Sequence, residues 1–168
     1  MKKEFIISID QGTTSSRAIL FNVKGKPVYS SQKEFTQYFP KSGWVEHDPE
    51  EIWNTTKKTL KDVINKSKRM RGRILAIGIT NQRETTVLWD KKTGKTVYNA
   101  IVWQDRRQAE FCKKLKKQNK ETMIFNKTGL PIDSYFSGTK IKWILDNVPK
   151  AKKLMNKKQL LFGTIDSF

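Results

Sequence analysis

Along the first 35 positions, apolar residues gather in short runs that are separated by turn-forming residues. The run at residues 5–9 predicts a first strand, and residues 17–21 and 28–35 predict a second and a third. The connections are short, and the step at residues 23–27 contains a glycine and a proline. Short connections of this kind predict an antiparallel meander.

The next segment carries a strong helix start signal. Asp48 suits the N-cap, Pro49 suits the first helical position, and Glu51 stands three residues after the cap. One face of this helix is expected to pack on the sheet, because apolar or small residues recur at helical spacing: Ile52, Thr56, Leu60, Val63 and Ile64.

The apolar run at residues 74–79 does not alternate with polar residues, which predicts a strand that is covered on both faces. Because this run follows a helix, we expect the strand to lie parallel to the first one. Three antiparallel strands, a helix and a parallel strand, in this order, predict an α/β fold of the ribonuclease-H-like (actin-like ATPase) type.

The second half of the chain is less regular. Residues 86–89 and 97–103 predict a hairpin, and residues 105–117 predict a helix. Ser137 is expected to cap a further helix, and residues 160–162 to begin one more strand. The inward side chains of the two helices are predicted to be Ala109, Cys112 and Leu115 in one, and Ile141, Ile144 and Leu145 in the other.

Composition narrows the class of protein. With 36% hydrophobic and 11% aromatic residues and no repeats or linkers, the chain is expected to fold as one domain across residues 1–168. Its apolar runs are far shorter than a membrane span, and no signal peptide pattern opens it. Cys112 is the single cysteine, which excludes an internal disulfide and fits the cytoplasm, and His47 is the only histidine, which excludes a Cys/His metal site.

The net charge of +18 raises the hypothesis of a nucleic-acid-binding module. Most of the excess is lysine in helix-like segments, whereas base recognition favours arginine and single-strand binding favours interleaved aromatic residues. We therefore interpret the charge as a solvated lysine surface without specific nucleic-acid binding.

Residues 9–17, IDQGTTSSR, follow the first strand and allow two interpretations. One is a solvated hairpin turn, and the other is a phosphate cradle in which small residues let an anion approach backbone N–H groups. Sheets of this kind place ligands beyond the carboxyl ends of their parallel strands. Asp10 and the polar residues 80–84 both follow such strand ends, so we expect them at one rim, which favours the cradle.

Six short motifs, in the same order, resemble the glycerol kinases of the FGGY carbohydrate kinase family. The motif SIDQGTTSSR alone would indicate only a sugar or polyol kinase, whereas the second and third motifs narrow the resemblance to glycerol. The six are SIDQGTTSSR (8–17), GWVEHDP (43–49), GITNQRET (78–85), YNAIVWQ (98–104), YFSGTK (135–140) and FGTID (162–166).

This resemblance implies ATP-dependent phosphorylation of glycerol to sn-glycerol 3-phosphate. By resemblance, Thr13, Thr14 and Ser15 bind the ATP phosphates, Arg17 contacts the nucleotide, and Asp10 holds Mg²⁺ through water. Phosphoryl transfer relies on positioned donors and positive charge around the phosphate oxygens, which agrees with these residue types. The alternative for Arg17 is a surface position in the middle of a strand.

The resemblance also implies a glycerol site formed by Arg83, Glu84 and Tyr135, with Trp103 as an apolar wall. A triol needs fixed donors and acceptors, which guanidinium, carboxylate and phenol groups supply. The alternatives are a salt-bridged strand end for the Arg–Glu pair and a core position for the tryptophan.

No catalytic residue is assigned in this chain. By resemblance, residues 1–168 are expected to be the truncated N-terminal domain of a two-domain kinase, with the rest of that domain and the second domain absent, and to be inactive alone. The family's general-base aspartate is then expected beyond residue 168, and the full-length protein is expected to be a homo-oligomer. Asp105 lies near Trp103 but is predicted to cap the helix at residues 105–117 rather than to act as a base. A ribonuclease-H-like nuclease, with Asp10 as a metal ligand, remains an alternative that needs more carboxylates at the same rim.

Overall fold

The computed structural model describes residues 3–168. The chain forms two compact units. The first unit contains the residues up to 37 together with 48–82, and the second unit contains residues 38–47 and 83–168.

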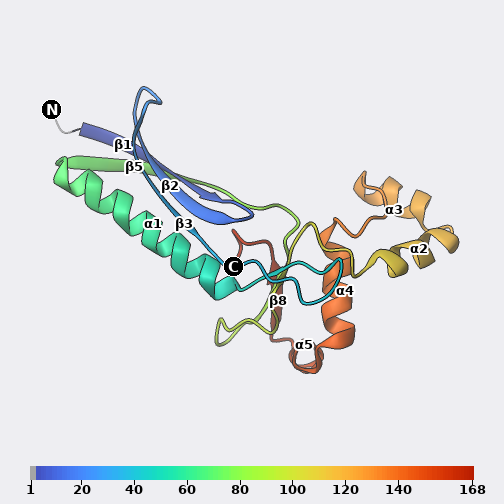
Figure 1. Cartoon of the computed structure of the whole chain (residues 1–168). Coiled ribbons are helices and arrows are strands. Elements are labelled where there is room, and N and C mark those ends of the chain that lie inside the picture. The colour runs from blue at the N-terminus through green and yellow to red at the C-terminus, as the bar shows by residue number, and fades with distance from the viewer. Residues whose placement is uncertain (1–2) are drawn as a thin grey trace. The chain divides into compact units, whose positions relative to one another are not determined.

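The first unit is a four-stranded sheet with one long helix (Figure 1). The strand order is β3-β2-β1-β5, formed by β3 (Pro27–Glu34), β2 (Ser15–Asn22), β1 (Lys3–Gln11) and β5 (Gly72–Thr80). β2 pairs antiparallel with both β1 and β3, whereas β5 pairs parallel to β1. Helix α1 (Pro49–Arg69) packs along one face of this sheet. The predicted meander, helix and parallel strand are confirmed.

Helix α1 begins where the sequence indicates. The Asp48 side chain accepts a hydrogen bond from the Glu50 N–H at 2.9 Å, and Pro49 is the first helical residue. Glu51 does not return to the cap: its carboxylate accepts from the N–H and the hydroxyl of Thr36, at 2.9 and 3.2 Å. The buried face of the helix consists of Pro49, Ile52, Thr56, Thr59, Val63 and Ser67.

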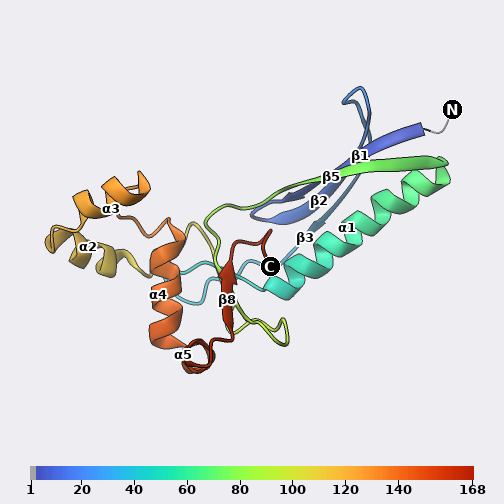
Figure 2. The ribbon, with the colours of Figure 1, turned by 180° about the vertical axis from the view of Figure 1, so that it is seen from behind.

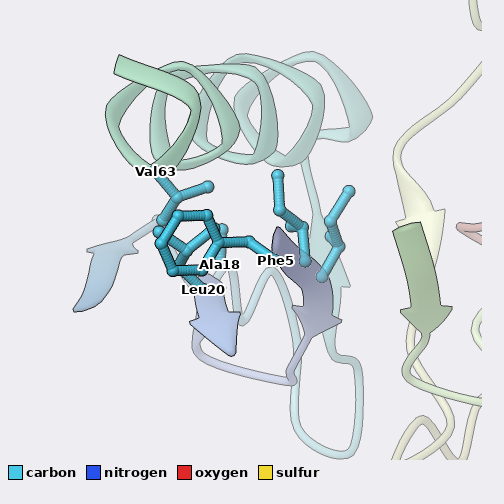
Figure 3. Close-up of a cluster of buried hydrophobic side chains, with 6 residues drawn as sticks. Phe5, Ala18, Leu20 and Val63 are labelled. Carbon is cyan, nitrogen blue, oxygen red and sulfur yellow. The ribbon is translucent and has the colours of Figure 1, made fainter. Parts of the chain in front are cut away.

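The core of the first unit lies between α1 and the sheet. Figure 3 shows Phe5 from β1 and Ala18 and Leu20 from β2 meeting Val63 of α1. Ile7 and Ile9 complete this buried cluster, since alternate residues of β1 face the helix.

The prediction that β5 is covered on both faces is wrong. Leu75, Ile77 and Ile79 are 45%, 49% and 58% exposed. The strand lies at the edge of the sheet with only β1 as a hydrogen-bonded neighbour, and α1 packs mainly against the other strands. Its apolar sequence is typical of a parallel strand, but β5 lacks the packed layers that usually bury both faces of such strands.

The second unit contains two short two-stranded sheets. Figure 2 shows their last strand, β8 (Leu160–Gly163), in dark red. β4 (Glu46–His47) pairs with β7 (Ala100–Ile101), and β6 (Val87–Asp90) pairs with β8 (Leu160–Gly163), all antiparallel. The strand at residues 160–162 was correctly predicted.

The predicted hairpin of residues 86–89 and 97–103 forms only in part. Its second strand shrinks to β7, and isolated bridges are the remaining links to the first. The reason is a side-chain attraction: the Tyr98 hydroxyl and the Asn99 amide donate to the Glu46 carboxylate at 2.6 and 3.0 Å. These bonds draw the segment toward β4.

Four helices belong to the second unit: α2 (Ala109–Lys117), α3 (Glu121–Thr128), α4 (Ser137–Asn147) and α5 (Pro149–Asn156). α2 starts four residues later than predicted, and α3 and α5 were not predicted. Ser137 is the first residue of α4 rather than its cap, which is Phe136. Within residues 3–168, the helices are too short or too polar to cross a bilayer.

Candidate functional site

The loop between β1 and β2 turns its carbonyl groups toward the protein. The carbonyl oxygen of Gly12 accepts from the Gln82 side-chain amide at 3.2 Å, and that of Thr13 accepts from the Gln37 amide at 3.1 Å. The Thr14 carbonyl accepts from the Phe35 N–H at 3.3 Å. A planar trans peptide directs its N–H opposite to its carbonyl, so the N–H groups of these peptides point away from the three donors. This is the arrangement that an anion-binding loop requires.

Asp10 and Arg17 lie at the mouth of this loop. They are directly opposite each other in the β1–β2 ladder, and Asp10 also stands beside Thr80 of β5. Side chains of residues in direct register share one face of the sheet. Arg17 Nε is buried and has no hydrogen-bond partner within the described part of the chain, which leaves a donor for an anion. Ser15 is buried, and its hydroxyl accepts from Gln32 at 2.9 Å.

The donor set fits a nucleotide with Mg²⁺ bound mainly by its phosphates. Within residues 3–168, no group of three or more His, Cys, Asp or Glu side chains is arranged to hold a metal ion. Mg²⁺ commonly keeps several waters and uses one or two carboxylates together with substrate phosphates. Asp10 alone is therefore a sufficient carboxylate for a water-mediated site, whereas a nuclease would need more.

The four residues of the predicted acceptor site all belong to the second unit. Arg83 is exposed and Glu84 half-buried in the turn before β6. Trp103 and Tyr135 meet edge to face, with their ring centroids 5.9 Å apart. Trp103 is half-buried, so it is available as a wall rather than sealed in a core.

Glu84 is fixed in an unusual conformation. Its φ of 65° lies in the left-handed region, which a non-glycine residue adopts only when its surroundings hold it there. Its Oε2 accepts from the N–H and from the hydroxyl of Ser137, both at 2.9 Å. The Ser137 hydroxyl thus binds Glu84 instead of its own helix.

Tyr135 is held by a turn that the sequence analysis missed. Its N–H donates to Asp133 Oδ1 at 2.7 Å, and its carbonyl accepts from Lys140 Nζ. Lys140 is wholly buried and also donates to the Ser134 carbonyl at 2.9 Å. The available signal was its spacing, because Lys140 stands one helical turn before the buried Ile144.

A largely apolar cavity of about 470 Å³ opens beside Glu84, between α2, α3 and α4. Its apolar lining includes Phe111, Leu115, Ile124 and Phe136. Of the four predicted acceptor residues, only Glu84 lines it, so this cavity is not assembled around the Trp103–Tyr135 pair.

The prediction that Asp105 caps the following helix is wrong. Its buried carboxylate accepts from the Val45 N–H at 2.7 Å and from the Arg107 guanidinium at 2.8 to 3.0 Å. The α2 helix starts later, with Gln108 at its cap position. With its oxygens engaged in this way, Asp105 is also unsuited to be a general base.

Arg107 is the centre of a buried ionic cluster, which the sequence analysis also missed. It pairs with Glu46 at 2.7 Å and with Asp105 at 2.8 Å, and its side chain is almost wholly buried. The guanidinium carbon lies 3.8 Å from the ring centroid of Trp44 and 4.6 Å from that of Trp143. The motif GWVEHDP supplies Trp44 and Glu46, and YNAIVWQ supplies Tyr98, whose hydroxyl accepts from Arg107 at 3.4 Å. Part of both motifs therefore serves the architecture of the second unit.

Comparison with protein families identifies the chain. Residues 5–168 match the N-terminal domain of the FGGY family of carbohydrate kinases. The chain belongs to this family. Its fold class is that of the actin-like ATPases, as its sheet order and its structural neighbours indicate.

Several relatives are similar over the whole chain. The glycerol kinase of Oceanobacillus iheyensis is 60% identical over 168 residues, which are all of this chain and 34% of that protein. The glycerol kinase of Alkaliphilus metalliredigens is 59% identical over 166 residues, 99% of this chain and 33% of that protein. The FGGY chain described here spans about a third of the length of these relatives.

Solved structures agree. A Plasmodium falciparum glycerol kinase with ADP superimposes with a TM-score of 0.93 at 35% identity, covering 98% of this chain and 33% of that one. A gluconate kinase from Lactobacillus acidophilus gives 0.82 at 25% identity, covering 98% and 32%.

Proposed function

We propose that these 168 residues are the part of a glycerol kinase that binds the ATP phosphates and the acceptor alcohol, within the first domain of a longer protein. The supporting observation in the first unit is an anion-type loop whose carbonyls are held by neutral donors. The second unit, considered by itself, adds a fixed carboxylate and an aromatic pair. Identity of 59–60% to glycerol kinases supports glycerol over other polyols.

The assigned roles follow the chemistry of each group. Thr13, Thr14 and Ser15 bind the ATP phosphates with N–H and hydroxyl donors, Arg17 contacts the nucleotide, and Asp10 binds Mg²⁺ through water. When bound, Mg²⁺ neutralises charge that develops on the phosphates.

For the acceptor, Arg83 donates to glycerol hydroxyls, Glu84 accepts from them, Tyr135 does either, and Trp103 covers the carbon chain. An oxygen of a terminal glycerol hydroxyl bonds to the γ-phosphorus while the bond from that phosphorus to the bridging oxygen breaks. ADP leaves with the electron pair. The hydroxyl proton passes to a base that we place beyond residue 168.

We also propose a cytoplasmic location and a homo-oligomeric full-length protein. The location is supported by the single buried Cys112, which needs no oxidising compartment. The oligomer rests on the family resemblance.

The test is a full-length hybrid in which residue 168 is continued by the remaining two thirds of the Oceanobacillus iheyensis glycerol kinase. We expect glycerol-dependent ADP release at about 1–10³ s⁻¹ with ATP and Mg²⁺. The controls are the isolated 168-residue chain and the isolated Oceanobacillus portion, neither of which should turn over. A folded, monodisperse hybrid without glycerol-dependent turnover would contradict the proposal.

A further inference from the structure

Lys140 is an unusual core residue. It lies in the first turns of α4, its side chain is wholly buried, and its ammonium donates to the carbonyl oxygens of Ser134 and Tyr135. Lysine is seldom buried completely, because desolvating its charge is costly. A methionine would fill the same space without that cost, so packing alone does not account for a lysine here.

What Lys140 fixes is the backbone of Tyr135. The Tyr135 N–H is held by Asp133 and its carbonyl by Lys140, so both sides of the residue are anchored. This anchoring sets the direction of the phenol ring, which lies edge-on to Trp103 and 5.2 Å from the ring centroid of Phe136.

Ser137 fixes Glu84 from the same turn of helix. Ser137 and Lys140 are three residues apart and therefore lie on one face of α4. Two hydrogen bonds from Ser137 end on Oε2 of Glu84 and a third, at 3.4 Å, ends on the Glu84 carbonyl oxygen, whereas Oε1 takes part in none of them. The Glu84 carbonyl is held by the Thr86 hydroxyl at 3.2 Å, which stabilises its left-handed backbone.

We propose that the first turn of α4 is the positioning element of the acceptor site, in which Ser137 orients the Glu84 carboxylate and Lys140 orients Tyr135. This inference rests on the proposed function for its ligand, glycerol. Glu84 and Tyr135 are 51 positions apart in sequence, and one rigid helical turn sets the distance between them. Glycerol must contact Glu84 and Tyr135 at the same time, so the distance between these two side chains selects for a ligand of that length.

The first test uses the 168-residue chain itself and needs no activity. Tyrosines are labelled with ¹³C at the ζ carbon, and the Tyr135 signal is assigned by its loss in Tyr135→Phe. We expect Lys140→Met to shift or broaden this signal, because the ring leaves its fixed place beside Trp103. Lys142→Met, two residues along the same helix at an exposed position, is the matched control and should leave it unchanged. An unmoved Tyr135 signal in a folded Lys140→Met chain overturns the proposal.

The second test measures kinetics in the full-length hybrid. We expect Lys140→Met and Ser137→Ala each to raise the KM for glycerol about tenfold to a hundredfold, because misplacement of about 1 Å has effects of that size. The KM for ATP should stay unchanged in both variants. Ser137→Thr, which keeps the hydroxyl, should have the glycerol KM of the unmutated hybrid. Ser137→Ala is expected to fold even if Lys140→Met does not, since alanine is well tolerated in a helix.

A double-mutant cycle separates positioning from stability. If Lys140 acts through Tyr135, the effects of Lys140→Met and Tyr135→Phe will not add. Additive effects, or a lower kcat at unchanged glycerol KM, would overturn the proposal. A hybrid without any glycerol turnover would count against the proposed function instead, while the tyrosine signal still decides the role of α4.

Discussion

The phosphate loop and the acceptor cluster are held in place by opposite means. The loop's carbonyls are bound by the neutral side-chain amides of Gln37 and Gln82 and by a backbone N–H. In the acceptor site the hydrogen bonds that hold the residues in place involve charged groups, namely the Glu84 carboxylate and the buried Lys140 ammonium. The difference follows from the ligands proposed for each. Neutral donors hold the loop without adding a charge beside the phosphates, whereas an uncharged triol is neither attracted nor repelled strongly by the fixed charges of its site.

The same contrast extends to the interior of the two units. The first unit has an apolar core under α1, while the second buries an arginine, two carboxylates and a lysine. Buried ions are costly when one partner is removed. The second unit should therefore be the more sensitive to single charge changes and to pH.

The largest expected effect comes from breaking the ionic cluster of the second unit. We expect Arg107→Ala to lower the free energy of unfolding by about 3–5 kcal/mol, because Glu46 and Asp105 would be left buried without their partner. Urea unfolding followed by tryptophan fluorescence measures this. The matched control is Arg106→Ala, since that side chain is 64% exposed and its pair with Asp133 should contribute at most about 1 kcal/mol. Equal losses of unfolding free energy in the two variants would show that the buried ion pairs of Arg107 contribute no more to stability than the exposed pair of Arg106.

The pH dependence of stability should be traced to Lys140. Burial lowers the pKa of Lys140 from 10.5 to about 8, although Glu84, Asp105, Asp133 and Cys112 favour its charged form. From about pH 8 to 10.5 the unfolded chain therefore binds the proton that the folded chain has released. Lys140 should therefore contribute a rise in the free energy of unfolding with pH across this window, on the order of 3 kcal/mol in total. The Cys112 thiol opposes this rise, because burial raises its pKa.

The measurement is urea unfolding of the 168-residue chain, followed by tryptophan fluorescence, at about pH 7 as a baseline and from about pH 8 to 9.5, inside the window that linkage defines. Lys140→Met should lose the rise with pH, while Lys142→Met should keep it. A wild-type curve that is flat above pH 8 would show that the buried ammonium keeps its charge.

Removing the exposed donor of the acceptor site should affect catalysis rather than folding. In the full-length hybrid, we expect Arg83→Ala to reduce glycerol kcat/KM by a factor equivalent to about 1.5–3 kcal/mol, the scale of a lost charged hydrogen bond. Arg73→Ala, whose exposed side chain pairs with Glu4, serves as the control. Unchanged kcat and glycerol KM would remove Arg83 from the site.

The smallest effect tests the phosphate loop. A Cβ at position 12 would lie 3.1 Å from the Ser15 carbonyl oxygen, so Gly12→Ala should shift the loop by a few tenths of an ångström. We expect the KM for ATP to rise about threefold to tenfold with an unchanged glycerol KM, since a full 1 Å costs about a hundredfold. Gly78→Ala is the control because a Cβ there meets open space. A change in glycerol KM instead would show that the two regions are not separable in this way.

The first unit was predictable because its signals are local. The Asp48–Pro49 start fixed the beginning of α1, and the short connections fixed the order of β1, β2 and β3. The exposure of β5 was not predictable in the same way. An apolar run indicates that a strand suits a covered position, but covering residues are not its sequence neighbours, so the run does not report whether cover is present.

The second unit was predicted less well because long-range side-chain contacts decide its structure. Glu46 attracts Tyr98 and Asn99, more than 50 positions away, and no local pattern reports this. The candidate residues Glu84, Trp103 and Tyr135 were named from motifs, yet the residue that positions Tyr135 was missed. Lys140 sits where helical spacing expects an apolar side chain, and a polar residue there has no single interpretation from sequence.

The tryptophans are divided unevenly between the two units, and two of them, Trp44 and Trp143, pack on Arg107. Four of its five tryptophans, at positions 44, 89, 103 and 143, belong to the second unit, whereas Trp53 on α1 is half exposed. Emission from the indoles therefore monitors mainly one unit. Far-ultraviolet circular dichroism monitors both, because α1 contributes 21 helical residues and α2, α3, α4 and α5 contribute 9, 8, 11 and 8. Superimposable melting curves from the two signals would mean that the units unfold as one cooperative block, and separated curves would give each unit its own melting temperature.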